Sequence, residues 1–202
     1  GKTEIYLQAI RQVITGGGTA IVLIPEISLT PQTIARFKSR FGDQVAVLHS
    51  QLSAGERFDE WRRIKEGTAR IVVGARSAIF APVKNLELIV IDEEHETTYK
   101  QENHPKYHAR EAAIKRANLN QAVTLLGTAT PSLEAYYRTQ TGDYKLLTLP
   151  DRIDDRPLPE VEIVDMREEL KAGNRTMVSR QLKTELEKRL AAGEQSIIFL
   201  NR

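Results

Sequence analysis

The chain has 202 residues, a formal net charge of +2 at pH 7, 41% hydrophobic residues and 28% charged residues. This length accommodates one sizeable domain and part of another, and so small a net charge does not by itself indicate a nucleic-acid partner. The absence of cysteine excludes disulfides and thiolate metal sites. No apolar stretch approaches the roughly 20 residues of a membrane-spanning helix. The lack of cysteine suits a cytoplasmic protein, which is what we expect.

Strand-like and helix-like segments alternate over residues 1–150, which we interpret as one lobe. The strands are predicted from short β-branched runs, and the helices from apolar spacing, Pro31 at a first helical position and a Ser53–Glu56 capping box. In chain order the predicted elements are a helix at Glu4–Ile14, strand Thr19–Ile24, helix Thr30–Phe41, strand Val45–Leu48, the helix after Ser53, strand Arg70–Val73, strand Leu86–Ile91, helix Tyr107–Ala117, strand Ala122–Leu126 and helix Ser132–Thr141. This alternation predicts an α/β fold, with a mainly parallel sheet flanked by helices.

The pattern changes near Asp151. Residues 151–160 contain Pro157 and Pro159 among charged residues and have no periodic apolar face, so they predict a linker. Beyond it the sequence predicts strand Val161–Val164, a loop around Gly173, helix Ser179–Ala192 and strand Ser196–Leu200. Because three such elements cannot bury much core alone, we interpret residues 161–202 as part of a second lobe.

The chain starts with Gly1-Lys2-Thr3, directly before the first predicted helix. These residues match the last third of the phosphate-binding loop G-x-x-x-x-G-K-[ST]. In such loops lysine reaches the β- and γ-phosphates, the threonine hydroxyl holds Mg²⁺, and the helix N-terminus offers free N–H groups. Three residues are a weak signal, and an ordinary helix start is the alternative.

The strongest signal follows the strand predicted at Leu86–Ile91. Asp92-Glu93-Glu94-His95 begins at its carboxyl end, where open α/β sheets bind ligands. Asp92 is placed to hold Mg²⁺, and Glu93 is the candidate base for an attacking water. An acidic, solvated turn is the alternative, but a motif of this composition directly after an aliphatic strand is rare by chance.

A zinc site is a poorer interpretation of the same region. From His95 onward the sequence is a near miss to H-E-x-x-H, because Tyr99 stands where the second histidine belongs. His104 and His108 have helical ligand spacing, but Pro105 follows the first of them. A loop histidine and a helix-start histidine are the simpler interpretation.

Other strand ends carry hydroxyls and cations. Thr128 and Thr130 leave the sheet at the same edge as Asp92, where they are placed to hydrogen-bond the acidic motif, although a turn capped by Ser132 is also consistent. A helix N-terminus with hydroxyls suits phosphate contacts. The individually weak candidates of this kind are Ser28, Thr30 and Gln32 in the Pro25–Gln32 segment, Arg76 and Ser77 in the Gly74–Ser77 segment and, less clearly, His49-Ser50.

The stretch from Thr97 to Arg110 interleaves aromatic residues with cations. Aromatic rings stack on unpaired bases while cations follow the phosphates. The candidates here are Tyr99, Lys100, Gln101, Tyr107 and Arg110. Because the stretch begins two residues after His95, a base that touches it is placed to act on the acidic motif. Packing of two tyrosines in a surface loop is the alternative.

Together these motifs resemble the superfamily 2 helicases and, more closely, the PriA (primosomal protein N′) family of bacterial replication-restart helicases. The resemblance covers essentially the whole chain, and its most specific parts are Gly74–Pro82 and the loop after His95. The matching stretches are Gly1–Glu4, Pro25–Gln32, Gly74–Pro82, Asp92–Glu96, Tyr99–Gln101, Tyr107–Arg110, Gly127–Glu134 and Phe199–Arg202.

The resemblance implies a RecA-like P-loop domain followed by the start of a second RecA-like lobe, and a 3′→5′ DNA helicase that uses ATP and Mg²⁺. It adds Glu4 to the nucleotide site of Gly1, Lys2 and Thr3, and it adds Lys2 and His95 to the catalytic groups. It implies single-stranded and forked DNA as partners, with primosome and single-strand-binding proteins, in the bacterial cytoplasm at the nucleoid.

The chain also departs from this family. The family's fork-binding region, the start of its phosphate loop and its later motifs are missing, and its zinc-binding insertion is expected only beyond Arg202. Residues 103–106 stand where a glycine-containing turn is expected. Two alternatives stay open: another superfamily 2 translocase or repair helicase, and a DNA-binding module with a degenerate ATPase. We expect the fragment alone to hydrolyse ATP poorly, because a complete site needs the whole loop and a closing second lobe.

Overall fold

The computed structural model describes residues 1–150 and 159–200. The chain divides into two compact units, Gly1–Ile153 and Asp154–Arg202. The predicted linker at residues 151–160 falls mostly on residues 151–158, which lie outside the described residues.

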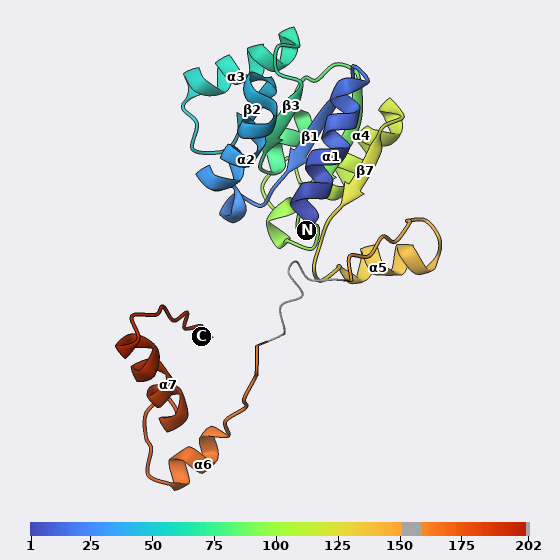
Figure 1. The fold of residues 1–202 in the computed structure, drawn as a ribbon. Coiled ribbons are helices and arrows are strands. Elements are labelled where there is room, and N and C mark those ends of the chain that lie inside the picture. The colour runs from blue at the N-terminus through green and yellow to red at the C-terminus, as the bar shows by residue number, and fades with distance from the viewer. Residues whose placement is uncertain (151–158, 201–202) are drawn as a thin grey trace. The chain divides into compact units, whose positions relative to one another are not determined.

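The first unit is built on a five-stranded sheet with the order β2-β3-β1-β4-β7 (Figure 1). All of its neighbouring strands are parallel. The strands are β1 (Thr19–Leu23), β2 (Val45–Leu48), β3 (Ile71–Gly74), β4 (Leu86–Ile91) and β7 (Val123–Leu126). The prediction of a mainly parallel α/β sheet is confirmed, with strand ends shifted by at most one residue.

Helices cover both faces of this sheet. The helices of the unit are α1 (Lys2–Thr15), α2 (Pro31–Phe41), α3 (Ala54–Glu66), α4 (Ala109–Asn120) and α5 (Leu133–Gln140), with short 3-10 turns η1 (Glu26–Ser28), η2 (Gly42–Gln44), η3 (Arg76–Phe80) and η4 (Thr97–Tyr99). The capping box predicted for α3 is present, with the Ser53 hydroxyl and the Glu56 carboxylate each accepting a backbone N–H. The Thr30 and Ser132 hydroxyls cap α2 and α5, each by accepting the backbone N–H of the residue three positions later.

The alternation of side chains along β1 shows how the core is divided. Ile21 and Leu23 point to the face covered by α3 and α4, while Ala20 and Val22 point to the face covered by α1 and α2. Because both faces are covered, every residue of β1 is buried, as expected for a central parallel strand. The carboxyl ends of β1 and β4 therefore emerge together at one edge of the sheet.

The segment after β4 contains a small hairpin that the sequence did not predict. β5 (Lys100–Gln101) pairs antiparallel with β6 (Tyr107–His108), and α4 follows directly. The helix predicted at Tyr107–Ala117 therefore begins at Ala109, two residues late, and ends at Asn120.

The second unit contains helices α6 (Met166–Lys171) and α7 (Arg180–Ala191). The predicted helix at Ser179–Ala192 is confirmed, whereas α6 was not predicted. The predictions of strands at Val161–Val164 and Ser196–Leu200 were wrong, because both segments lie outside regular secondary structure. An isolated strand cannot pair its backbone groups, and among the described residues this unit has no other strand to pair with.

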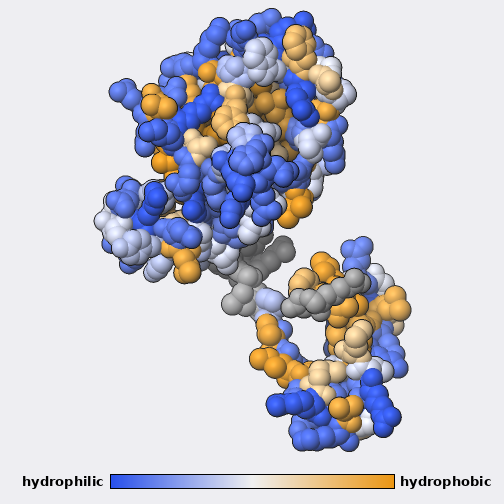
Figure 2. Space-filling view, turned by 180° about the vertical axis from the view of Figure 1, so that it is seen from behind, coloured by the Kyte–Doolittle hydropathy of each residue, from blue (hydrophilic) through white to orange (hydrophobic). Residues whose placement is uncertain are grey.

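Large apolar side chains lie on the surface of this second unit, where Figure 2 shows them in orange. Ile163, Ile197 and Phe199 are among the most exposed. None of the helices in residues 1–150 and 159–200 combines the length and apolarity needed to traverse a bilayer.

Candidate functional site

The start of α1 meets the end of β4. The Lys2 Nζ lies 2.5 Å from the Glu93 Oε1, although the two residues are 91 positions apart in the sequence. Glu93 has a left-handed φ of 46°, a conformation that costs an L-residue on the order of 1 kcal/mol. The two predicted sequence motifs thus form one cluster, with both side chains partly exposed.

Asp92 is fixed by two tyrosines from different elements. The Tyr6 hydroxyl on α1 donates to the Asp92 Oδ1 at 2.9 Å, and the Tyr99 hydroxyl donates to the Asp92 backbone carbonyl at 2.7 Å. Burial, and then the negative charge of Asp92, raise the pKa of both hydroxyls, so that both stay protonated donors. The sequence did not single out Tyr6, because nothing local in α1 reveals a partner 86 residues away.

Tyr99 itself is 1% exposed. The sequence predicted an aromatic ring that faces nucleic acid, but burial leaves this ring no free face for a base to stack on. Its hydroxyl also donates to the Leu23 carbonyl at 3.1 Å, which ties η4 to the ends of both central strands.

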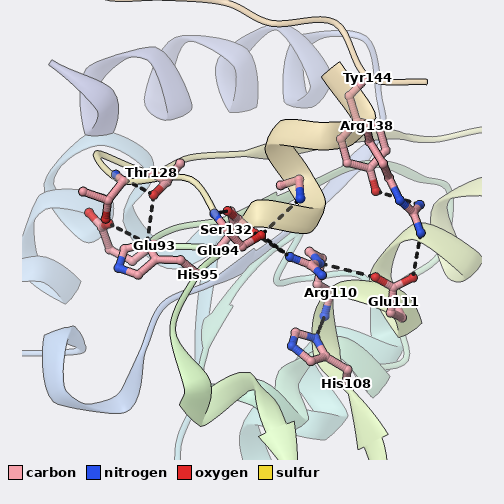
Figure 3. Close-up of polar contacts among 12 residues, drawn as sticks. Glu93, Glu94, His95, His108, Arg110, Glu111, Thr128, Ser132, Arg138 and Tyr144 are labelled. Carbon is pink, nitrogen blue, oxygen red and sulfur yellow. Dashed lines mark hydrogen bonds and ion pairs between the residues drawn. The ribbon is translucent and has the colours of Figure 1, made fainter. Parts of the chain in front are cut away.

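His95 reaches the segment after β7, as Figure 3 shows. Its Nδ1 lies 2.8 Å from the Thr128 Oγ1 and 3.7 Å from the Glu93 Oε2. The Thr128 hydroxyl also accepts from the Thr130 backbone N–H at 3.0 Å. The contact that the sequence predicted between a threonine hydroxyl and the acidic motif therefore occurs through Thr128, while Thr130 contributes its backbone.

A buried ion pair joins the acidic motif to α4 and α5 (Figure 3). The Arg110 Nη1 lies 2.7 Å from the Glu94 Oε2 and donates to the Ser132 Oγ at 2.7 Å. Glu94, which is 1% exposed, also accepts from the Ser132 backbone N–H at 2.7 Å. Burial opposes the charge on Arg110, but the Glu94 hydrogen bond and charge outweigh it and raise the pKa of that guanidinium.

This arrangement changes the role expected of Arg110. The sequence placed it among the residues facing nucleic acid, but its guanidinium is buried and bound inside the protein. Glu94, which received no role in the sequence analysis, is the central acceptor. The sequence motif predicts functions only for the neighbours of Glu94, so it gave no signal for the role of this residue.

Arg76 fastens the loop after β4 to the end of β3. Its Nη1 donates to the Thr98 carbonyl at 3.0 Å and to the Lys100 carbonyl at 2.7 Å. Its guanidinium carbon lies 5.9 Å from the centroid of the Tyr107 ring, against which Phe80 packs edge-on at 5.1 Å. The predicted cation is present at this edge, but much of its hydrogen bonding is directed into the protein.

The remaining candidates lie at exposed or half-buried positions. The Thr30 hydroxyl accepts from the Thr33 N–H, and the Ser28 carbonyl accepts from the Thr33 hydroxyl, so both stabilise the start of α2. Across the hairpin, the Gln101 side chain donates to the Pro105 carbonyl at 2.9 Å. The exposed members of the set are Thr30, Gln32, Ser77, Lys100 and Thr130.

The residues near Asp92 fit a magnesium ion that is shared with phosphate oxygens. Such ions are usually held by one or two carboxylates plus substrate phosphates, and Asp92 and Thr3 supply a carboxylate and a hydroxyl of the required type. Within the described part of the chain, no group of three or more His, Asp or Glu residues is placed to hold a metal by itself.

Comparison with known proteins places the chain in a family. A model of the DEAD/DEAH box helicases matches residues 1–139. The chain belongs to the DEAD/DEAH box helicase family. The match includes the start of α1, the acidic motif and the Gly127–Ser132 segment, which are the elements brought together at this edge of the sheet.

Relatives of known name match this chain over its full length. It is 60% identical over 202 residues to the replication restart protein PriA of Bacillus subtilis (strain 168), and 51% identical over 207 residues to the protein of the same name from Synechocystis sp.. Both alignments cover 100% of this chain and 25% of the relative. The chain therefore spans about a quarter of the length of these relatives.

The fold is shared with solved helicase structures. The Saccharomyces cerevisiae Dbp5 L327V structure bound to RNA and ADP BeF3 aligns with 67% of this chain and 35% of its own, with a TM-score of 0.50 and 15% identity. At this identity the likeness concerns the fold alone, and it supports a RecA-like domain for the first unit.

Proposed function

We propose that this chain is the motor core of an ATP-dependent 3′→5′ DNA helicase that acts in bacterial replication restart. Hydrolysis of Mg-ATP would be coupled to the binding of single-stranded DNA. The observation that carries the proposal is the convergence of Lys2, Glu93 and Asp92 at one edge of the sheet, within a helicase family domain.

The roles of the residues follow from their chemistry. Lys2 would bind phosphate oxygens as a point charge, with Gly1 and Glu4 flanking it at the start of α1. Glu93 would accept a proton from the attacking water, and Asp92, oriented by Tyr6, would hold Mg²⁺ together with Thr3. When bound, Mg²⁺ supplies neutralisation of the charge on the transferring phosphate. His95 would relay the state of this cluster to Thr128.

Two contacts between the hairpin segment and the acidic motif support the coupling to DNA. Tyr99 lies one residue before the hairpin and donates to the Asp92 carbonyl. Arg110 follows the hairpin and binds Glu94. Both ends of the hairpin segment are thus anchored to the acidic motif, so a strand of DNA that displaces it would also act on Asp92 and Glu94.

Substitution of Glu93 tests the assignment. In the full-length protein, Glu93→Gln should abolish hydrolysis stimulated by single-stranded DNA while nucleotide binding is retained, because the amide cannot take the proton. Glu66→Gln, an exposed change on α3, is the matched control. Undiminished hydrolysis in the Glu93→Gln protein would contradict the role of Glu93.

The wider setting rests on the relatives. We propose residues 1–150 as the first lobe, 151–160 as a linker and 161–202 as part of a second lobe. Forked DNA, primosome proteins and single-strand-binding proteins would be partners of the full-length bacterial protein. That protein would act in the cytoplasm at the nucleoid, and zinc would be bound only beyond Arg202.

Another superfamily 2 translocase would also hydrolyse ATP, but would not restore restart in cells that lack the PriA protein. A degenerate module would bind DNA without hydrolysis.

A further inference from the structure

Two residues of α1, one helical turn apart, contact two consecutive residues of the acidic motif. Lys2 pairs with Glu93, and the Tyr6 hydroxyl donates to the Asp92 Oδ1 at 2.9 Å. Because positions i and i+4 of a helix lie on the same face, these two contacts lie next to each other where α1 meets the end of β4. Glu93 thus takes the lysine, and the partner of the Asp92 carboxylate is an uncharged phenol.

The Tyr6 side chain is held rigidly in this position. It is 4% exposed, and its ring belongs to the apolar cluster on the α1 and α2 face of the sheet, together with Val22 and Val90. Its hydroxyl oxygen lies so close to Gly127 that a Cβ on that residue would be 1.6 Å away. Because protein cores are closely packed, the phenol cannot swing away from Asp92 without disturbing its neighbours.

The main chain of Asp92 is fixed as well. Its N–H donates to the Leu23 carbonyl at 2.9 Å, and its carbonyl accepts from the Tyr99 hydroxyl at 2.7 Å. Within residues 1–150 and 159–200, the carboxylate accepts a side-chain hydrogen bond from Tyr6 alone, at Oδ1. Oδ2 is therefore the oxygen that the surrounding protein leaves available to a cation.

We propose that Tyr6 makes this site selective for Mg²⁺ over Ca²⁺, by restricting Asp92 to one metal-binding oxygen. Ca²⁺ takes about six to eight oxygen ligands in flexible geometry and accepts both oxygens of one carboxylate, whereas Mg²⁺ demands a near-ideal octahedron and keeps several waters. A charge-assisted hydrogen bond at Oδ1 holds the carboxylate in one orientation and draws charge from that oxygen. It therefore disfavours binding through both oxygens more than binding through Oδ2.

Tyr6 is in this sense a positioning residue, and its role rests on the proposed function. The test uses the full-length protein and a fluorescent, non-hydrolysable ATP analogue, with Mg²⁺ alone or Ca²⁺ alone. The unaltered protein should bind the analogue more tightly with Mg²⁺. In Tyr6→Phe, which keeps the ring, the ratio of the two affinities should fall about tenfold, chiefly through tighter binding with Ca²⁺.

Two results would contradict different parts of this scheme. An unchanged ratio in Tyr6→Phe would overturn the role of Tyr6 and leave the proposed function standing. If the unaltered full-length protein bound the analogue with neither metal, the proposed function would fail, and the role of Tyr6 with it.

Tyr99→Phe is the matched control, because it removes a second buried hydroxyl that contacts Asp92 at its carbonyl and not at its carboxylate. The ratio of Mg²⁺ to Ca²⁺ affinities should be unchanged in this variant. Urea denaturation of both variants measures what each hydroxyl contributes to stability, which is independent of the choice of metal. An equal fall of the ratio in both variants would attribute the selectivity to packing around Asp92 and overturn the role of the Oδ1 hydrogen bond.

Discussion

The carboxylate of Glu94 and the guanidinium of Arg110 form an ion pair at 2.7 Å with almost no exposure to solvent. The pair connects the acidic motif after β4 with the first turn of α4, and Ser132 extends it to α5. Burial makes the pair sensitive to the loss of either partner, because the charge that remains has no water to solvate it.

Removal of Arg110 should therefore destabilise the fold strongly. We expect Arg110→Met to lower the free energy of unfolding by about 3–5 kcal/mol, because Glu94 would be left as a buried, unpaired carboxylate. Adding Glu94→Gln in the same chain should recover part of the loss, since the buried charge is then absent. Urea denaturation of the single and double variants gives the coupling energy between the two residues.

The control for this pair is Glu111, which also contacts Arg110, at 3.3 Å, but is exposed. Glu111→Gln should cost no more than about 1 kcal/mol, as is usual for surface ion pairs. A similar cost for Glu111→Gln and Arg110→Met would contradict the importance of burial.

Gly127 should not tolerate a side chain. A Cβ there would lie 1.6 Å from the Tyr6 hydroxyl oxygen and 2.7 Å from the ring carbon that bears it. We expect Gly127→Ala to destabilise the fold by roughly 1–3 kcal/mol or more and to disturb the Tyr6–Asp92 hydrogen bond. Tyr6→Phe in that background should restore only part of the stability, since the second contact remains. Thermal unfolding followed by circular dichroism measures both effects.

Gly55 provides the contrast. It lies in the first turn of α3, and a Cβ added there would have no other atom within 4 Å. Gly55→Ala should leave stability unchanged or raise it by up to about 1 kcal/mol, because alanine is the better helix former. Destabilisation by both substitutions would show that steric contact with Tyr6 is not the cause.

Lys2 should govern nucleotide affinity. In the full-length protein, Lys2→Met should weaken binding of a fluorescent ATP analogue about tenfold or more, because a charged hydrogen-bond donor to the phosphates is lost. Lys38→Met on α2 serves as the control for lost charge. Unchanged affinity in the Lys2→Met protein would show that the start of α1 does not bind phosphate.

His108 should make stability depend on pH. Its Nδ1 accepts the Arg110 backbone N–H at 3.2 Å, which requires a neutral ring. Burial, and then the charge of Arg110, lower the pKa of His108 below its usual 6.5. The unfolded chain therefore binds the proton more tightly, so this stabilisation is present above pH 6.5 and is lost as the pH falls through the folded pKa.

Urea denaturation over a pH series measures this effect. His108→Asn, whose side-chain oxygen can still cap α4, should remove the contribution of this group to the pH dependence. An identical fall in stability below pH 6.5 in both proteins would assign it to other groups.

Local patterns were sufficient to predict most of the first unit. β-branched runs such as Leu86–Ile91 became buried strands, and Ser53 with Glu56 formed the expected capping box. The same kind of pattern failed at Val161–Val164, because a strand also needs a neighbour, and pairing is not a local property.

The chemistry of the site was predictable at strand ends and not within the core. Asp92 and Glu93 lie where open sheets bind ligands, whereas the partnerships of Tyr6 and Glu94 join segments that are distant in the sequence. Composition predicted that Tyr99 and Arg110 belong to a segment that contacts nucleic acid. It could not show that both side chains are buried in the protein.

The attachment of the loop by Arg76 limits how this segment can be exchanged between proteins. Arg76, which binds the loop carbonyls, lies at the end of β3. The carbonyls that accept from the Tyr99 hydroxyl lie at the ends of β1 and β4. A chimaera that received only residues 97–110 would lack the carbonyl and guanidinium partners that shape them. The smallest transplantable cassette includes all three strand ends, so the loop and the sheet edge have to be inherited together.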